Sequence, residues 1–367
     1  MTNPLVRLGE LGQSPWYDYI TRDLLASGEL RRLVGEDGLR GMTSNPTIFE
    51  KAVAGSRLYD DEIRQLGEQG RSAGEIFESL AVADVRAACD EFAALHHETG
   101  GRDGHVSLEV SPALAHDADG TVHEAERLWA AVGRPNAMIK IPGTLAGLKA
   151  ITHAVAAGIN VNVTLLFSVE RYAAVIEAWL GGLERRLAAG HALEPLASVA
   201  SFFVSRVDGK VDALLDRDGD PHGLRGKIAI ANACAAYRLF EWSLGTSRWD
   251  RLAKAGARPQ RPLWASTSTK DPRYPDVYYV EALVAPRTVN TLPPETFAAY
   301  RDHGRPAVRI HEGVAAHTGQ LRALADTGID LAAITAELEE DGVAKFAASY
   351  RSLLAGIDAK AGALAGR

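Results

Sequence analysis

The sequence predicts an α/β protein that folds as a (β/α)8 TIM barrel, with additional helices in insertions and at the C-terminus. Eight short apolar or alternating runs recur along the chain, and longer segments of helical period separate them. No Gly-x-Gly-x-x-Gly motif follows the first run, which disfavours the alternative of an open doubly wound sheet that binds a dinucleotide. The chain has 367 residues, against the roughly 250 of a usual barrel, and the additional helices account for the excess.

The predicted strands follow one another with helical segments between them. They cover residues 16–19, 39–43, 105–110, 137–141, 160–166, 196–204, 262–266 and 287–290. This alternation is expected of repeated βα units around a parallel sheet.

The clearest predicted helix covers residues 169–189, where apolar residues step by three and four to form one stripe. The stripe consists of Tyr172, Ile176, Trp179, Leu183 and Leu187. Two more long helices are predicted over residues 72–98 and 227–244. The Ala-rich tail, residues 330–363, predicts two helices with a break at Asp341-Gly342. No fixed repeat or low-complexity linker divides the chain, so we expect residues 1–367 to form a single domain.

The composition is that of an ordinary globular protein, with 46% hydrophobic and 24% charged residues. A net charge of -7 disfavours a general nucleic-acid binder but allows a local cationic pocket for a small phosphate. Residues 1–11 lack a basic segment followed by an apolar run, and no stretch approaches the length of a membrane span. We therefore expect a cytoplasmic location without membrane association. Cys89 and Cys234 have no Cys/His spacing that would indicate a disulfide or a zinc site.

Lys140 is the most informative residue, because it stands where an apolar strand gives way to a loop, in Met-Ile-Lys-Ile-Pro-Gly-Thr at 138–144. Burial at the end of a strand would lower the pKa of its ammonium and suit the amine to Schiff-base formation. A shift of about 3 pKa units costs roughly 4 kcal/mol, which the site must supply. An isolated strand-end lysine more commonly extends to water, so its polar neighbours decide the interpretation.

Catalytic residues of a barrel lie at the C-terminal ends of the strands, and polar residues fall at most of the predicted ends. They are Asp18, Asn45, Glu109, Lys140, Asn160, Asn162, Thr164, Ser201, Ser205, Arg206 and the run from Ser266 to Lys270. The three polar residues at 160, 162 and 164 alternate along one strand and therefore share one face. Two acids, one lysine, several amides and hydroxyls, and one or two cations would meet at a single mouth.

Several of these residues also have ordinary structural explanations. Asp18 could cap a nearby helix, and Asn45, which precedes a proline, suits a turn or an N-cap. Arg206 could form an ion pair with Asp208. Glu109, by contrast, lies between apolar neighbours, and carboxylates are rarely buried without a partner. It is the convergence of the whole set that favours a catalytic site.

Long motifs occur in a fixed order along nearly the whole chain. They are Ser-Pro-Trp-Tyr-Asp at 14–18, Thr-Ser-Asn-Pro-Thr-Ile-Phe at 43–49, Ile-Lys-Ile-Pro-Gly-Thr at 139–144, Asn-Val-Thr-Leu-Leu-Phe-Ser at 162–168, Ala-Ser-Phe-Phe-Val-Ser-Arg at 200–206 and Arg-Pro-Leu-Trp-Ala-Ser-Thr at 261–267. In these motifs the chain resembles the transaldolases of the longer bacterial type. The resemblance implies transfer of a dihydroxyacetone unit from sedoheptulose 7-phosphate to glyceraldehyde 3-phosphate, giving erythrose 4-phosphate and fructose 6-phosphate. It places this reaction in the non-oxidative pentose phosphate pathway and implies no metal or other cofactor.

The resemblance also implies roles for individual residues. Lys140 matches the Schiff-base lysine, and Asp18 matches the carboxylate that takes the hydroxyl proton during carbon–carbon cleavage. Glu109 matches an acid/base that works through a water held by Thr164. Substrate binding is implied for Asn45, Asn162, Ser201, Phe203 and the phosphate-binding Arg206. Shorter family members have a second phosphate-binding arginine after the seventh strand, where this chain has Ser-Thr-Lys-Asp-Pro, so Lys270 is expected to take that role as a point charge.

Three other functions remain open. Another class I aldolase, acting on fructose 6-phosphate or deoxyribose 5-phosphate, would use the same lysine but a different acceptor. An isomerase would need a base but no imine, and a non-catalytic binding protein would hold sugar phosphates without turnover. We expect sugar-phosphate substrates as partners, and the sequence leaves both a monomer and a homodimer open.

Overall fold

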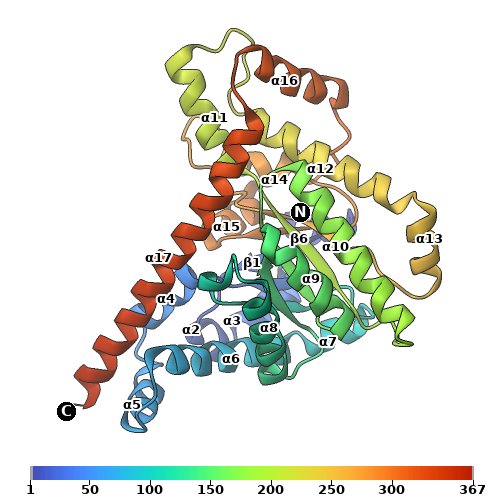
Figure 1. The fold of residues 1–367 in the computed structure, drawn as a ribbon. Helices are drawn as coiled ribbons and strands as arrows, with labels where there is room; N and C mark the ends of the chain where they lie inside the picture. Colours follow the sequence, from blue (N-terminus) through green and yellow to red (C-terminus); the bar gives the residue numbers. More distant parts are fainter. Residues whose placement is uncertain (1–2, 366–367) are drawn as a thin grey trace.

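The computed structural model describes residues 3–365 and contains a closed barrel of parallel strands in the order β1 to β8 (Figure 1). The strands are β1 Gln13–Asp18, β2 Gly41–Thr43, β3 His105–Glu109, β4 Ala137–Pro142, β5 Val161–Leu166, β6 Ser198–Phe203, β7 Arg261–Ala265 and β8 Thr288–Leu292. Each strand predicted from the sequence is present, and the (β/α)8 fold is confirmed.

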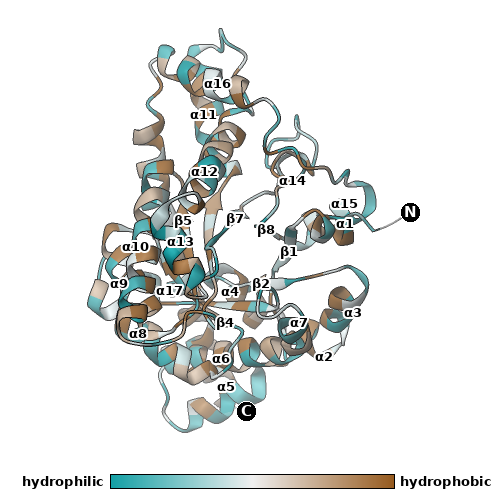
Figure 2. Cartoon of the chain, turned by 90° about the vertical axis from the view of Figure 1, so that its right-hand side faces the viewer, coloured by the Kyte–Doolittle hydropathy of each residue, from teal (hydrophilic) through white to brown (hydrophobic). Residues whose placement is uncertain are grey.

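Helices surround the barrel and carry both hydrophobic and hydrophilic residues, as expected of helices with one face on a core (Figure 2). They are α1 Pro4–Glu10, α2 Arg22–Ala26, α3 Glu29–Glu36, α4 Pro46–Gly55, α5 Asp60–Glu68, α6 Ala73–Glu91, α7 Ala93–Glu98, the 3-10 helix η1 Pro112–Leu114, α8 Ala118–Val132, α9 Leu145–Ala157, α10 Val169–Ala188, α11 Ser205–Asp218, α12 Ile228–Leu244, α13 Ser247–Lys254, α14 Tyr278–Ala282, α15 Pro294–His303, α16 Val314–Asp326 and α17 Leu331–Ala365.

Hydroxyl side chains cap the N-termini of α9 and α10, the helices that follow β4 and β5. Thr144 accepts a hydrogen bond from the Gly147 N–H at the start of α9, and Ser168 accepts one from the Arg171 N–H at the start of α10. Each satisfies one of the free amides of a helix N-terminus. These caps fix the point where each chain segment leaves the mouth of the barrel.

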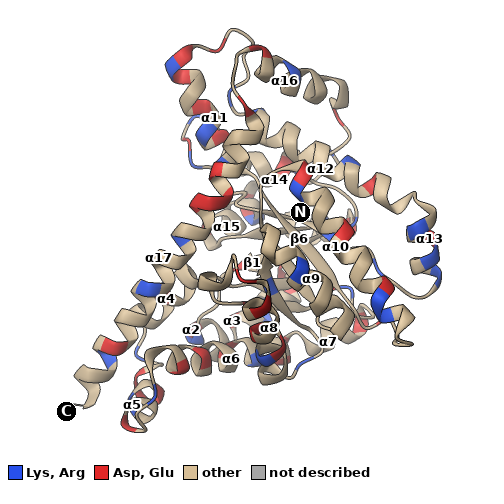
Figure 3. Cartoon of the chain, in the orientation of Figure 1, with Lys and Arg blue, Asp and Glu red and all other residues tan. Residues whose placement is uncertain are grey.

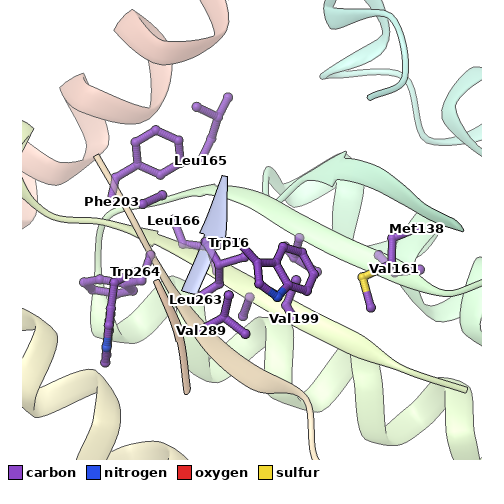
Figure 4. Close-up of a cluster of buried hydrophobic side chains, with 14 of the residues drawn as sticks. Trp16, Met138, Val161, Leu165, Leu166, Val199, Phe203, Leu263, Trp264 and Val289 are labelled. Atoms are coloured by element: carbon purple, nitrogen blue, oxygen red, sulfur yellow. The ribbon is translucent and has the colours of Figure 1, made fainter. Parts of the chain in front are cut away.

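The barrel interior is filled by a layer of apolar side chains between its two ends. Figure 4 shows Trp16 of β1 together with Val199 of β6, Leu263 of β7 and Val289 of β8, all fully buried. Gly41 of β2 makes room for this packing, because a Cβ there would lie 2.5 Å from the Trp16 ring. The layer separates the polar residues at the C-terminal ends of the strands from those at the N-terminal ends.

The predicted break at Asp341-Gly342 is wrong, since α17 continues through it as one helix of 35 residues (Figure 1). Gly342 is buried, and a Cβ at this position would lie 2.9 Å from Leu165 Cδ2. The glycine therefore permits close contact between α17 and β5 instead of ending a helix. An apolar stripe continues across it at helical spacing, formed by Ile334, Leu338, Phe346, Leu353 and Ile357.

Two smaller expectations also need correction. The segment predicted as one helix over residues 72–98 is divided at Phe92 into α6 and α7. On α10 the predicted stripe is buried except for Leu187, which is 36% exposed near the end of the helix.

Charged residues of both signs are distributed over the outer helices, and α17 carries acids and bases along its length (Figure 3). Within residues 3–365, no helix is long and apolar enough to cross a membrane.

Candidate active site

Lys140 lies inside the barrel near its C-terminal end and is only 4% exposed. Its Nζ donates a hydrogen bond to the Ser44 carbonyl at 3.2 Å and lies 3.4 Å from Glu109 Oε2. Register explains the second contact, because Glu109 of β3 and Asn162 of β5 are the direct neighbours of Lys140 across the sheet. The amine is thus held between a carbonyl and a carboxylate.

The Glu109 side chain is only 7% exposed at the end of β3, as its apolar neighbours in the sequence suggested. Burial raises the pKa of Glu109 to about 7, although Lys140 acts in the opposite direction. Its Oε2 atom and the hydroxyl of Thr164 are both buried without a hydrogen-bond partner among the described residues. Buried polar atoms of this kind commonly bind water, so both side chains are suited to hold one.

Asp18 ends β1 and accepts a short hydrogen bond from Thr43 Oγ1 at 2.6 Å. Thr43 Oγ1 is in turn 2.7 Å from the hydroxyl of Thr291 on β8. Contacts with β1 and β8 therefore fix the orientation of the Thr43 side chain. Burial raises the pKa of the Asp18 carboxyl, whereas Lys140 and the Thr43 hydrogen bond lower it. Asp18 does not cap a helix, because Thr21 is the N-cap of α2.

Asn162 and Ser201 form a hydrogen-bonded pair inside the barrel. Ser201 Oγ donates to Asn162 Oδ1 at 2.7 Å, and Asn162 Nδ2 donates to Ser107 Oγ at 3.0 Å. All three side chains are buried. This network presents polar groups of known orientation next to Lys140.

Asn45 has the structural role that its position before a proline suggested. Its side chain accepts a hydrogen bond from the Ile48 N–H and caps α4. The same residue also lines the cavity at the barrel mouth, which has a volume of about 480 Å³. Capping and contact with a ligand are compatible, because the cap uses only the side-chain oxygen.

Arg206 supplies a cation at this mouth and does not form the ion pair with Asp208 that was an alternative from the sequence. Asp208 instead accepts hydrogen bonds from the Ala229 N–H and the Tyr279 hydroxyl. The Arg206 guanidinium lies 5.0 Å from the centre of the Phe203 ring, and both residues line the cavity. Lys270 also lines it but is exposed, so the two cations differ in their degree of enclosure.

Several cavity residues were missed from the sequence, and Phe346 and Lys51 are two of them. Phe346 of α17 lines the cavity, and its ring centre is 5.7 Å from Lys140 Nζ. Lys51 of α4 lines the cavity as well, and it is a third amine there besides Lys140 and Lys270. The apolar stripe that continues across Gly342 could have indicated that the tail packs on the barrel, but not that it covers the mouth.

Backbone strain is located at the same end of the barrel. Leu165 and Ser266 have φ values of 60° and 54°, in the left-handed region that costs non-glycine residues about 1 kcal/mol. Leu165 directly follows Thr164 and lies where the β5–β6 register shifts. Strain of this kind is characteristic of functional sites, because the surrounding packing must hold it in place.

Comparison with known proteins gives a consistent result. The family described as Transaldolase/Fructose-6-phosphate aldolase matches residues 15–357. A protein named Transaldolase from Frankia alni is 50% identical over 359 residues, which are 96% of either chain. Another Transaldolase, from Acidothermus cellulolyticus, is 50% identical over 97% of this chain and 96% of its own length. Transaldolase 2 from Nostoc sp. is 47% identical over 98% of this chain and 97% of its own. The resemblance seen in the sequence motifs is thereby confirmed, and the chain belongs to the transaldolase/fructose-6-phosphate aldolase family.

Proposed function

We propose that the protein is a transaldolase that transfers a dihydroxyacetone unit from sedoheptulose 7-phosphate to glyceraldehyde 3-phosphate through a Schiff base on Lys140. The observation that carries this proposal is the buried Lys140 amine, which lies 3.4 Å from the buried Glu109 carboxylate and lines a cavity together with Asp18 and Arg206. The products are erythrose 4-phosphate and fructose 6-phosphate, in the non-oxidative pentose phosphate pathway. We place the reaction in the cytoplasm.

The first step forms the imine. Lys140 Nζ attacks the donor carbonyl to give a carbinolamine, which then loses water. Both events need a proton carrier beside the lysine nitrogen, and Glu109 is suited to it because burial raises its pKa to about 7. A water between Glu109 and Thr164 would extend its reach, since both have buried atoms free to bond it.

The second step breaks the carbon–carbon bond. Asp18 accepts the proton of the C4 hydroxyl, the C3–C4 bonding electrons pass into the iminium, and an enamine and an aldehyde result. The iminium accepts the electron pair, so the residues described perform this step without further groups. The Thr43 hydrogen bond at 2.6 Å orients the Asp18 carboxylate for this role.

The enamine must remain bound and dry until the acceptor aldehyde arrives. Asn162, Ser201 and Asn45 are suited to bind the hydroxyls of the three-carbon unit. Phe203 and Phe346 supply apolar cover at the mouth. Arg206 is suited to bind the terminal phosphate with its planar fork, and Lys270 would act as a point charge at the rim.

Product analysis with and without acceptor tests this function against the related fructose 6-phosphate aldolase activity. With fructose 6-phosphate and erythrose 4-phosphate we expect sedoheptulose 7-phosphate and glyceraldehyde 3-phosphate to form. Without acceptor we expect little free dihydroxyacetone. Release of dihydroxyacetone at the rate of transfer would instead assign the protein as an aldolase.

The role of Lys270 needs a separate test, because it is exposed while Arg206 is partly enclosed. If both bind phosphate, Arg206→Ala and Lys270→Ala should each raise KM for phosphorylated substrates, and Arg206→Ala should have the larger effect. An unchanged KM in Lys270→Ala would exclude Lys270 as a phosphate ligand.

A further inference from the structure

A second cavity lies at the opposite end of the barrel from the candidate active site. Its volume is about 420 Å³, similar to the 480 Å³ of the mouth. Strands β1 and β4 each contribute residues to both cavities. Ser14 and Met138 line the second cavity, while Asp18 and Lys140 line the first. The buried Trp16 lies between Ser14 and Asp18 on the same face of β1, because alternate residues of a strand share one face. The two cavities are therefore separate.

The lining of this N-terminal cavity is strongly cationic. Its arginines are Arg40, Arg102, Arg258, Arg261 and Arg287, and Asp103 is the one acid that lines it within residues 3–365. The chain as a whole has a net charge of -7, so the cavity has the opposite sign to the protein. A concave surface of one sign concentrates ions of the other.

Asp103 is already occupied by its neighbours. Its Oδ1 accepts hydrogen bonds from Ser14 Oγ at 2.6 Å and from Arg261 Nη1 at 3.1 Å, and its Oδ2 accepts one from Arg102 Nε. Across the described chain, neither Arg40 nor Arg258 has an acid within ion-pair distance. The lone carboxylate therefore leaves most of the positive charge uncompensated.

Arg261 is held rigidly at the base of the cavity. Its side chain is 10% exposed and also donates from Nη2 to the Arg102 carbonyl at 2.7 Å. No residue between 3 and 365 accepts from its Nε–H. A buried guanidinium with a fixed plane and a free donor is prepared to bind an anion without losing side-chain entropy.

Two residues that line this cavity, Gly101 and Arg287, have positive φ values. Gly101 has φ +79°, and a Cβ there would lie 2.6 Å from Arg258 Nη1, so the guanidinium occupies space that only glycine leaves free. Arg287 itself has φ 58°, a left-handed conformation that costs an arginine about 1 kcal/mol. Strained non-glycine residues of this kind gather at functional sites, as Leu165 and Ser266 do at the other end of the barrel.

We propose that the N-terminal cavity is a second binding site, for a small anion that carries more than one phosphoryl group. Guanidinium groups match the paired oxygens of phosphate, and the five lining arginines with one carboxylate carry more positive charge than a single phosphoryl group neutralises. The volume suits a small diphosphate or a sugar bisphosphate. This site is independent of the reaction at Lys140, because none of the residues that carry it lines the mouth.

Calorimetric titration of the full chain with pyrophosphate tests the proposal. The Arg206→Ala variant removes the more enclosed of the two proposed phosphate-binding cations of the mouth, and we expect it still to bind pyrophosphate at one site per chain. When Arg40→Ala and Arg258→Ala are added to the Arg206→Ala variant, pyrophosphate binding should weaken at least tenfold. A matched control, Arg31→Ala with Arg217→Ala, removes two exposed arginines outside the cavity and should leave the affinity unchanged.

Arg287→Gly gives a second variant that should keep the fold, because glycine adopts the left-handed conformation without strain. We expect transfer activity to be unchanged and pyrophosphate binding to weaken about threefold or more. Equal weakening in the Arg31/Arg217 control would show a general charge effect and overturn the proposal. Loss of all binding in Arg206→Ala, or no binding to the wild-type chain at millimolar pyrophosphate, would overturn it too.

Discussion

Glu109 Oε2 lies 3.4 Å from Lys140 Nζ, and both side chains are almost fully buried on neighbouring strands. Two opposite charges removed from water stabilise a protein little, because desolvation offsets most of their attraction. Burial accordingly raises the pKa of Glu109 to about 7 in spite of the adjacent lysine. The pair therefore contributes little to stability, and it suits the proton transfer that we propose at Lys140.

This pKa predicts how stability depends on pH. The carboxyl titrates near 4.5 when unfolded and near 7 in the fold, so its contribution is complete below pH 4.5 and is lost as the pH rises through 7. The free energy of unfolding of the wild type should therefore fall by up to about 3 kcal/mol over this range because of Glu109. Glu109→Gln should remove this fall.

Urea unfolding at pH 5 and pH 8 measures the effect. Glu98→Gln, at an exposed glutamate without an ion pair in residues 3–365, is the control and should keep the wild-type pH dependence. If Glu109→Gln and the wild type show the same difference between the two pH values, Glu109 does not titrate as described.

Asp18→Asn separates imine formation from carbon–carbon cleavage. The amide keeps the size of the side chain but cannot accept the C4 hydroxyl proton, so transfer should fall by about 10²-fold or more. Reductive trapping of the donor on the enzyme should persist, since the imine forms at Lys140. Rapid-quench transfer assays beside a trapping assay measure both steps. A variant that loses trapping and transfer to the same extent would assign Asp18 to imine formation instead.

Phe346 should protect the enamine from water, because it brings apolar cover from α17 to within 5.7 Å of Lys140 Nζ. In Phe346→Ala we expect more release of free dihydroxyacetone relative to transfer. Leu353→Ala removes another buried side chain from the same helix that does not line the cavity, at a cost of about 2–5 kcal/mol in stability. Its ratio of release to transfer should stay at the wild-type value. An equal rise in both variants would trace the effect to loosening of the helix.

Because α17 packs closely on β5, a glycine-to-alanine substitution should have opposite effects on stability at two positions of α17. Gly356 has open space around it, so Gly356→Ala should stabilise the protein by about 1 kcal/mol through helix propensity. At Gly342 a new Cβ would lie 2.9 Å from Leu165 Cδ2, and overpacking should cost about 1–3 kcal/mol. Thermal unfolding compares the two. A similar gain in both would mean that α17 does not pack closely on Leu165.

The strands and most of the mouth were predictable because their signals are local. An apolar run marks each strand, and a polar residue at its end is placed at the mouth by barrel geometry alone, as Asp18 and Lys140 are. The path of the tail was not predictable, because Gly342 permits either a helix end or a close contact, and only Leu165, distant in the sequence, decides between them. The N-terminal cavity was missed for a similar reason, since its arginines come from several loops and from the first residue of β7, without a shared motif.

The most direct measurement is borohydride reduction in the presence of fructose 6-phosphate, followed by peptide mapping by mass spectrometry. The chain supplies its own internal controls, since Lys51 and Lys270 also line the mouth. A Schiff base as proposed predicts an adduct of the mass of reduced dihydroxyacetone on Lys140 and no trapping in Lys140→Arg. An adduct on Lys51 or Lys270 alone, or an unmodified Lys140 in a folded and active protein, would contradict it.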